Sequence, residues 1–197
     1  LNEKTKNLDA LTNRLTLLEQ ENLRLKELLS IPKEQSAPVC TARCVGKVLQ
    51  GEYHVLYVQA GSRQGLQVGQ PVLAQNALIG IVEDVGLYSA RILLTSDPSF
   101  QIPVRTIESQ SDGILAGNVL GQLQLSFLQD STTISPAETV VSSGIGGVFP
   151  PDLLLGHTYL QKNGDVHVIP PLELKDISFV QILLTPQTSK APGEAHD

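Results

Sequence analysis

The first thirty residues repeat apolar side chains with a period of seven. Residues 1–30 contain no glycine and no proline, so nothing in them interrupts a helix. Two leucine-rich series, offset by three positions, place one apolar seam along that helix, which is the pattern of a coiled coil. We expect the coiled coil to occupy residues 1–31 and to wind left-handedly. Its predicted dimer seam consists of Leu8, Leu11, Leu15, Leu18, Asn22, Leu25 and Leu29.

One position of this seam is polar, and charged residues flank it. Asn22 would cost stability but would favour two strands in a single register. In a parallel pair, Arg14 would face Glu19 and Glu21 would face Lys26 of the second helix, so both inter-chain pairs are opposite in charge. We therefore predict a parallel homodimer. An amphipathic helix that packs on its own chain, through leucines outside the seam, is the alternative.

Beyond residue 38 the helical period gives way to a period of two. In Q-L-Q-L-S, for example, Leu123 and Leu125 alternate with polar residues, and Asn163-Gly164 has the residues of a tight hairpin turn. Short alternating segments with turn residues about every ten positions predict a β-barrel or a β-sandwich.

The same pattern divides the β-rich part into units. The strand-turn-strand segments that contain residues 69–82 and 137–158 resemble each other weakly, which indicates two similar units. We expect a mainly β fold, in which the N-terminal coiled-coil α-helix is followed by two small β-barrel-like domains. Their predicted limits are 39–110 and 111–185, and the two domains could exchange strands. We predict that residues 186–197 form a disordered tail.

Composition and charge narrow the function. The chain carries 20 acidic and 14 basic residues, a net charge of −6, which argues against a nucleic-acid binder. No apolar run approaches the roughly 18 residues of a membrane span. The chain opens on Leu1 and contains no methionine, so we expect a fragment or a mature form whose membrane anchor, where there is one, precedes Leu1.

The cysteines and histidines indicate no metal site. Cys40 and Cys44 are four residues apart, which is about 13 Å in an extended strand, whereas the Cα atoms of a disulfide lie within about 7 Å. A local turn could bring the two together, but we interpret them as small apolar strand residues. The four histidines show no metal-ligand spacing.

The stretch from Thr139 to Gly156 combines serines, glycines and a double proline, and admits three interpretations. As a catalytic loop, it would place Ser143 after His54 and Asp97, in the chain order of chymotrypsin-like proteases, but V-S-S-G-I-G-G replaces that class's G-D-S-G-G. As a phosphate-binding loop, it lacks the required lysine and the helix that follows. We therefore predict no enzyme, no metal and no cofactor.

The third interpretation is a structural turn. Glycines supply backbone angles that other residues avoid, and the double proline stiffens the bend. Phe149 and Leu153 would pack beneath the turn as core, or would form part of an exposed docking patch instead. The residues of this structural turn or candidate docking patch are Gly144, Gly146, Gly147, Phe149, Pro150, Leu153 and Gly156.

The order of these motifs resembles one family. Residues 17–29 read L-L-E-Q-E-N-L-R-L-K-E-L-L, and residues 60–72 read A-G-S-R-Q-G-L-Q-V-G-Q-P-V. Residues 93–104 read L-L-T-S-D-P-S-F-Q-I-P-V, and residues 142–156 read S-S-G-I-G-G-V-F-P-P-D-L-L-L-G. Together they resemble the extracytoplasmic part of the rod shape-determining MreC family. The chain departs from the family pattern at Ala137-Glu138, where Gly-Asp is usual, and at Ala77 and Ile81.

The resemblance implies a function as well as a fold. It implies a non-enzymatic, dimeric scaffold of the cell-elongation complex, anchored in the inner membrane, with this part in the periplasm. The implied partners are a class B penicillin-binding transpeptidase, RodA, MreD and MreB. The alternatives are a periplasmic adaptor of an efflux or secretion system, which usually carries a second heptad helix that this chain lacks, and the protease discussed above.

Overall fold

The computed structural model describes residue 14 and residues 38–51, 53–126, 134–162, 164–173 and 177–184. The chain divides into two compact units, residues 1–37 and residues 38–197. In the first unit only Arg14 is described, and it is helical. The predicted coiled-coil seam, the remaining residues of the predicted inter-chain ion pairs (Glu19, Glu21 and Lys26) and the predicted tail at 186–197 lie outside the described residues.

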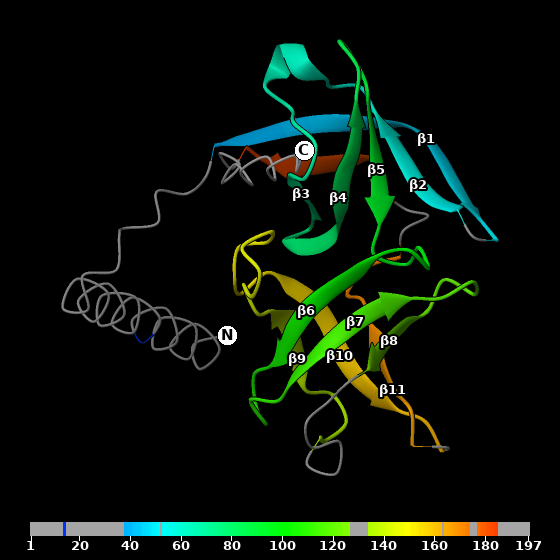
Figure 1. Ribbon diagram of the computed structural model, residues 1–197, viewed down its shortest axis with the longest axis vertical. Coiled ribbons are helices and arrows are strands. Elements are labelled where there is room, and N and C mark those ends of the chain that lie inside the picture. The colour runs from blue at the N-terminus through cyan, green and yellow to red at the C-terminus, as the bar shows by residue number, and fades with distance from the viewer. Residues whose placement is uncertain are drawn as a thin grey trace, which may run out of the picture. The chain divides into compact units, whose positions relative to one another are not determined.

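The described part of the second unit is built from strands (Figure 1). A single short 3-10 helix, η1 (Ser62–Gln64), accompanies them there. The strands are β1 (Val39–Gln50), β2 (Tyr53–Val58), β3 (Pro71–Ala74), β4 (Ala77–Val85), β5 (Ala90–Leu94), β6 (Gln101–Thr106), β7 (Asp112–Gly117), β8 (Leu123–Ser126), β9 (Thr139–Ser142), β10 (Leu154–Leu160), β11 (Val166–Ile169) and β12 (Phe179–Leu183). The predicted mainly β fold is confirmed for these residues.

Six strands close into a first barrel. Their order around the ring is β1–β2–β5–β4–β3–β12, and β12 pairs back onto β1, with every neighbouring pair antiparallel. The chain thus builds five strands of this ring first and supplies the sixth at its far end. Closure matters because it leaves no long edge strand open to other chains.

The remaining six strands close into a second antiparallel barrel. Their order is β6–β7–β8–β11–β10–β9, and β9 pairs back onto β6. One parallel pairing, between Leu154 of β10 and Ala77 of β4, joins the two rings. Figure 1 shows the two sets of strands around separate centres.

Each barrel has its own apolar core. The first is built around residues such as Leu56, Ile92 and Ile182, and the second around residues such as Ile102 and Leu115, all of which are almost fully buried. Burying each such side chain stabilises the fold by about 1.5–3 kcal/mol. Because strands alternate their faces, the other residues of these strands point outward.

Part of the first barrel's outer surface is also buried. Leu73 of β3 and Leu78 of β4 belong to the core cluster of the second barrel, and Ile81 and Leu93 pack against it. The two barrels therefore share an apolar contact and bury each other's surface. The domain limits at 39–110 and 111–185 stay a prediction. The first cluster draws on the strands of the first barrel, whereas the second draws on β6–β11 and also on Leu73 of β3 and Leu78 of β4.

Candidate functional site

The turn between β9 and β10 is closed by the side chain of Ser142. Its hydroxyl donates a hydrogen bond to the carbonyl oxygen of Pro150 (2.6 Å) and accepts one from the main-chain N–H of Leu153 (2.9 Å). The main chain of Ser142 bonds to Leu153 and Asp152 as well, each at 2.9 Å. With 1% of its surface exposed, Ser142 fastens both ends of the turn from inside.

Glycine is required in this turn for two different reasons. Gly144 has a φ of +74°, in the left-handed region, and a Cβ there would lie 3.1 Å from the Cβ of Pro151. Gly156, on β10, instead passes directly over β11, and a Cβ there would overlap the carbonyl oxygen of Ile169. Gly146 and Gly147 lie at the tip, also with positive φ. The backbone of the turn therefore depends on glycine at these positions.

The apolar side chains of the turn point in two directions. Phe149 is buried and packs edge-to-face on Phe100, with ring centroids 6.0 Å apart. Leu153 is half-buried and packs against the second core. Ile145 and Val148 are each 57% exposed. Sequence reasoning missed these last two, although Ile145 lies between two glycines and Val148 directly follows Gly147.

The three residues of the protease hypothesis do not form a triad. In a triad the aspartate accepts a hydrogen bond from the histidine ring. Here Asp97 accepts one from the main-chain N–H of His54 (2.8 Å), while the ring Nδ1 of His54 lies 2.8 Å from the carbonyl oxygen of Ser96. The hydroxyl of Ser143 accepts a bond from Ile145 in the β9–β10 turn. These contacts hold the main chain in place and are not the hydrogen bonds of a triad.

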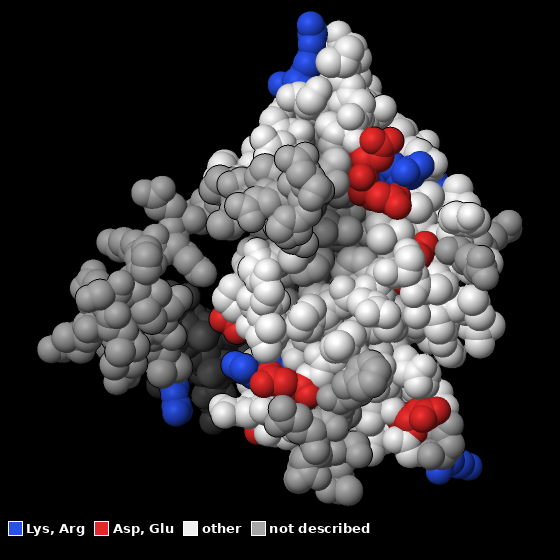
Figure 2. Space-filling view, viewed as in Figure 1, with Lys and Arg blue, Asp and Glu red and all other residues white. Residues whose placement is uncertain are grey.

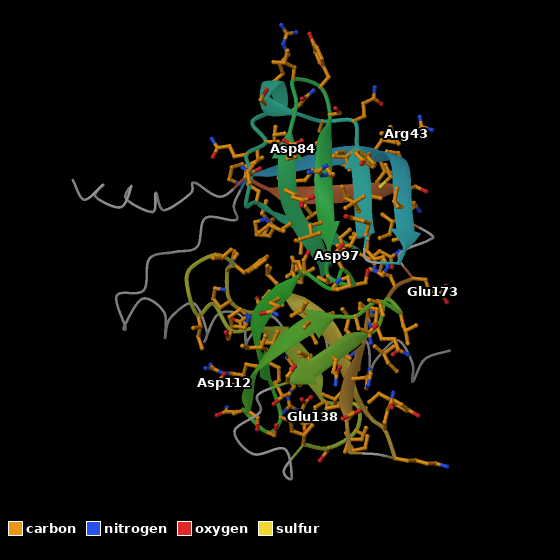
Figure 3. The ribbon with its side chains drawn as sticks, turned by 45° about the vertical axis from the view of Figure 1, so that its right-hand side comes forward. Arg43, Asp84, Asp97, Asp112, Glu138 and Glu173 are labelled. Atoms are coloured by element: carbon orange, nitrogen blue, oxygen red, sulfur yellow. The ribbon has the colours of Figure 1, made fainter. Side chains whose placement is uncertain are left out.

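Asp97 has a structural function at the junction of the barrels, where Figure 3 places it. Burial alone would raise the pKa of its carboxyl. The hydrogen bonds from the His54 main chain and from the N–H and hydroxyl of Ser99 outweigh that effect, so the pKa of Asp97 lies below its ordinary value. The carboxylate is therefore charged at neutral pH and pins the β5–β6 connection to β2.

Neither cysteine has the lowered pKa of an activated nucleophile. Both Cys40 and Cys44 are free and half-buried, and burial raises the pKa of each thiol. Within the described ranges, no group of three or more His, Cys, Asp or Glu side chains could hold a metal ion. Among the same residues, no helix is long and apolar enough to cross a bilayer.

A second surface feature, which sequence reasoning did not find, is a groove on the outside of the first barrel. The groove has a volume of about 660 Å³. It crosses β1, β2 and β5, and the β5–β6 connection at residues 97–99 borders it. Tyr53 and Tyr57, which are 70% and 38% exposed, both line it. We refer to it below as the tyrosine groove.

Known proteins resemble this chain in sequence and in structure. The model of the family "Rod shape-determining protein MreC, barrel core" matches residues 44–183. The cell shape-determining protein MreC of Caulobacter vibrioides is 31% identical over 172 residues, which cover 87% of this chain and 50% of that protein. This chain thus spans about half the length of that relative.

Solved structures share the fold. The crystal structure of MreC from Pseudomonas aeruginosa is 27% identical, has a TM-score of 0.67, and is matched over 74% of this chain and 98% of that one. A complex between penicillin-binding protein PBP2 and MreC from Helicobacter pylori is 15% identical, with a TM-score of 0.52 over 74% of this chain and 99% of that one, and shows the fold alone. The resemblance inferred from the motifs is confirmed: this chain belongs to the rod shape-determining MreC family.

Proposed function

We propose that this chain is a non-enzymatic, dimeric scaffold that positions peptidoglycan-synthesising enzymes in the cell-elongation complex. The observation that carries the proposal is the family match across residues 44–183, which covers both barrels. The rigid β9–β10 turn and the hydrogen bonding of His54, Asp97 and Ser143 support a binding function over a catalytic one. The barrels act in this proposal as docking blocks.

The proposed dimer forms through the predicted coiled coil. Thirty helical residues would make a rod about 45 Å long, at about 1.5 Å per residue. Two barrel bodies on one rod raise the effective concentration of a second contact once a first has formed. An N-terminal anchor outside this sequence would hold the rod at the inner membrane, with the barrels in the periplasm.

The proposed partners are a class B penicillin-binding transpeptidase, RodA, MreD and MreB. The Helicobacter pylori MreC that shares this fold has been captured in a complex with PBP2, which supports the first of them. Ile145 and Val148 supply an exposed apolar pair on a rigid support, as a docking contact requires, since little order is lost on binding.

Restoration of cell shape tests the proposal. The full-length protein is expressed in its host after depletion of the native copy, either unchanged or with Ile145→Asp and Val148→Asp together. We expect the unchanged protein to restore rods and the double variant to give rounded cells at the same protein level. Leu120→Asp is the matched control, because Leu120 is 77% exposed in the turn after β7. Rod-shaped cells with the double variant would show that the β9–β10 turn is not part of the docking surface. Rounded cells with the unchanged protein would refute the scaffold function.

A further inference from the structure

The floor of the tyrosine groove is a row of aliphatic side chains on three neighbouring strands. Val48 pairs with Val55, and Val55 pairs with Leu93, so the three lie side by side across β1, β2 and β5. All three line the groove. Val55 is 8% exposed although it points away from the barrel core, because the groove's walls cover it. The floor is therefore apolar and runs across the strands.

The walls stand about one helix diameter apart. Tyr53 and Tyr57 are four residues apart on the same face of β2, which places their Cα atoms about 13 Å apart along the strand. An α-helix with its side chains is about 10 Å across. The three strands of the floor span about 10 Å, which is roughly two helical turns. An α-helix laid across the strands would thus meet a tyrosine on each side.

The walls are held in place by contacts within the protein. Tyr57 packs over Gly46 of β1, where a Cβ would lie 3.6 Å from its ring. On the other side, the hydrogen bond from the His54 main chain to Asp97 fixes the 97–99 connection next to Tyr53. A helix would consequently enter a preformed site, which keeps the entropy cost of binding low.

Charge gives the groove a direction. Glu83 of β4 and Arg91 of β5 line the groove beside Tyr57, and Asp84 pairs with Arg91 next to this lining. Arg91 donates a 2.9 Å hydrogen bond to Glu83, and both carboxylates raise the pKa of its guanidinium. Figure 2 shows acidic and basic side chains side by side over this part of the first barrel. Two carboxylates against one guanidinium leave this wall with one net negative charge, which favours a basic residue on the partner.

We propose that the tyrosine groove binds an amphipathic α-helix of a partner protein. The helix lies across β1, β2 and β5, places aliphatic side chains spaced i, i+3/i+4 and i+7 on Val48, Val55 and Leu93, and directs a lysine or arginine toward Glu83 and Asp84. The volume of about 660 Å³ accommodates several such side chains. The inference rests on the proposed scaffold function, which supplies the need for partners, and it assigns a contact separate from the β9–β10 turn.

A selection experiment tests the recognition chemistry. The probe is a phage library of helical peptides with randomised surface positions, selected on the 197-residue chain. We expect enriched peptides with one aliphatic stripe at i, i+3/i+4 and i+7 and a basic residue beside it. Enrichment of proline-rich or strictly alternating peptides, or no enrichment, would overturn the proposal.

Variants then locate the contact by fluorescence anisotropy with the best peptide. Val48→Asp should weaken binding about tenfold, because it sets a carboxylate under an apolar contact. Val39→Asp is the matched control on the same strand, outside the groove and 48% exposed, and should change binding less than about twofold. Equal losses from both would overturn the assignment. Tyr53→Ser replaces Val48→Asp if the latter fails to fold, which thermal melting reveals.

The charge of the wall has its own test. Asp84→Lys should weaken the affinity for the basic peptide several-fold at low salt. The loss of affinity should be smaller at high salt, because salt screens exposed charges. Unchanged affinity at low salt would contradict the direction we assign. Failure of the peptide selection would leave the cell-shape experiment intact, and failure of the cell-shape experiment would leave the peptide contact intact, so the two inferences can fail separately.

Discussion

Replacing Ser142 by alanine should destabilise the protein, because it removes the side-chain hydrogen bonds that hold the β9–β10 turn. The exposed side chains of the turn stay unchanged. The variant removes the bond donated to the carbonyl of Pro150 and the bond accepted from the N–H of Leu153. A buried main-chain group that loses its partner costs about 1–3 kcal/mol. Because Pro150 and Leu153 are half-buried, the lower end applies to each, and we expect a total loss of about 2–3 kcal/mol.

The assay is urea unfolding of the 197-residue chain, followed by thermal melting. For a chain of this size, each kcal/mol lowers the melting temperature by about 2–4 °C, so the expected fall is about 4–12 °C. The m-value should stay constant, because the variant exposes no additional surface on unfolding.

Ser143→Ala is the control that makes this experiment decisive. The hydroxyl of Ser143 accepts one 3.3 Å bond from Ile145 on the exposed side of the turn, so its loss should stay within about 0.5 kcal/mol. If Ser143→Ala costs as much as Ser142→Ala, the assignment of the anchoring residue is wrong. If Ser143→Ala instead abolishes a measurable peptide hydrolysis at unchanged stability, the protease alternative returns.

Four further predictions concern other parts of the chain. Leu15→Asp with Leu18→Asp should give a monomer at micromolar concentration, and sedimentation equilibrium that still shows a dimer would contradict the seam. Asn22→Val should melt higher but associate less strictly as a dimer, and a lower melting temperature would contradict its seam position. Asp97→Asn should lower the free energy of unfolding by about 1.5–3 kcal/mol at neutral pH. Because the pKa of Asp97 is lowered in the folded state, the difference in stability from wild type should shrink as pH falls through that lowered pKa. A stability difference that stays constant between neutral and strongly acidic pH would contradict this. Gly156→Ala should cost more than about 3 kcal/mol, because β10 cannot keep its contact with β11, and a soluble variant with wild-type stability would refute the close approach.

Alternation along the chain predicted strands but could not predict how they close. In β3 every residue from Pro71 to Ala74 is buried, so the period of two disappears there. The cause is tertiary: Val72 faces the core of its own barrel, whereas Leu73 faces the second barrel. A strand covered on both faces reads as a continuous apolar run, and a single sequence does not say what covers each face.

The departure from the family pattern at Ala137-Glu138 now has a physical explanation. Ala137 has a φ of +65°, the left-handed conformation that glycine adopts without cost. The carboxylate of Glu138 then accepts hydrogen bonds from the main-chain N–H of Ser135 (2.6 Å) and the hydroxyl of Ser109 (2.7 Å). The turn keeps the backbone that a glycine would favour, and the Glu138 carboxylate reaches both Ser135 and Ser109. Sequence alone showed the substitution but not the geometry that accepts it.

The use of tyrosine in this chain bears on the choice between a docking block and a reaction chamber. The chain has four tyrosines, and all of them are exposed: Tyr53, Tyr57, Tyr88 and Tyr159. A buried tyrosine needs a hydrogen-bonding partner for its hydroxyl, and the two apolar barrel cores offer few such partners. At protein interfaces, by contrast, tyrosine supplies a large contact area with few torsions to fix. Two of the four flank the tyrosine groove, whose floor is aliphatic. The residue type best suited to interface contacts thus lies beside a preformed groove, and the closed barrel behind the groove keeps its surface rigid.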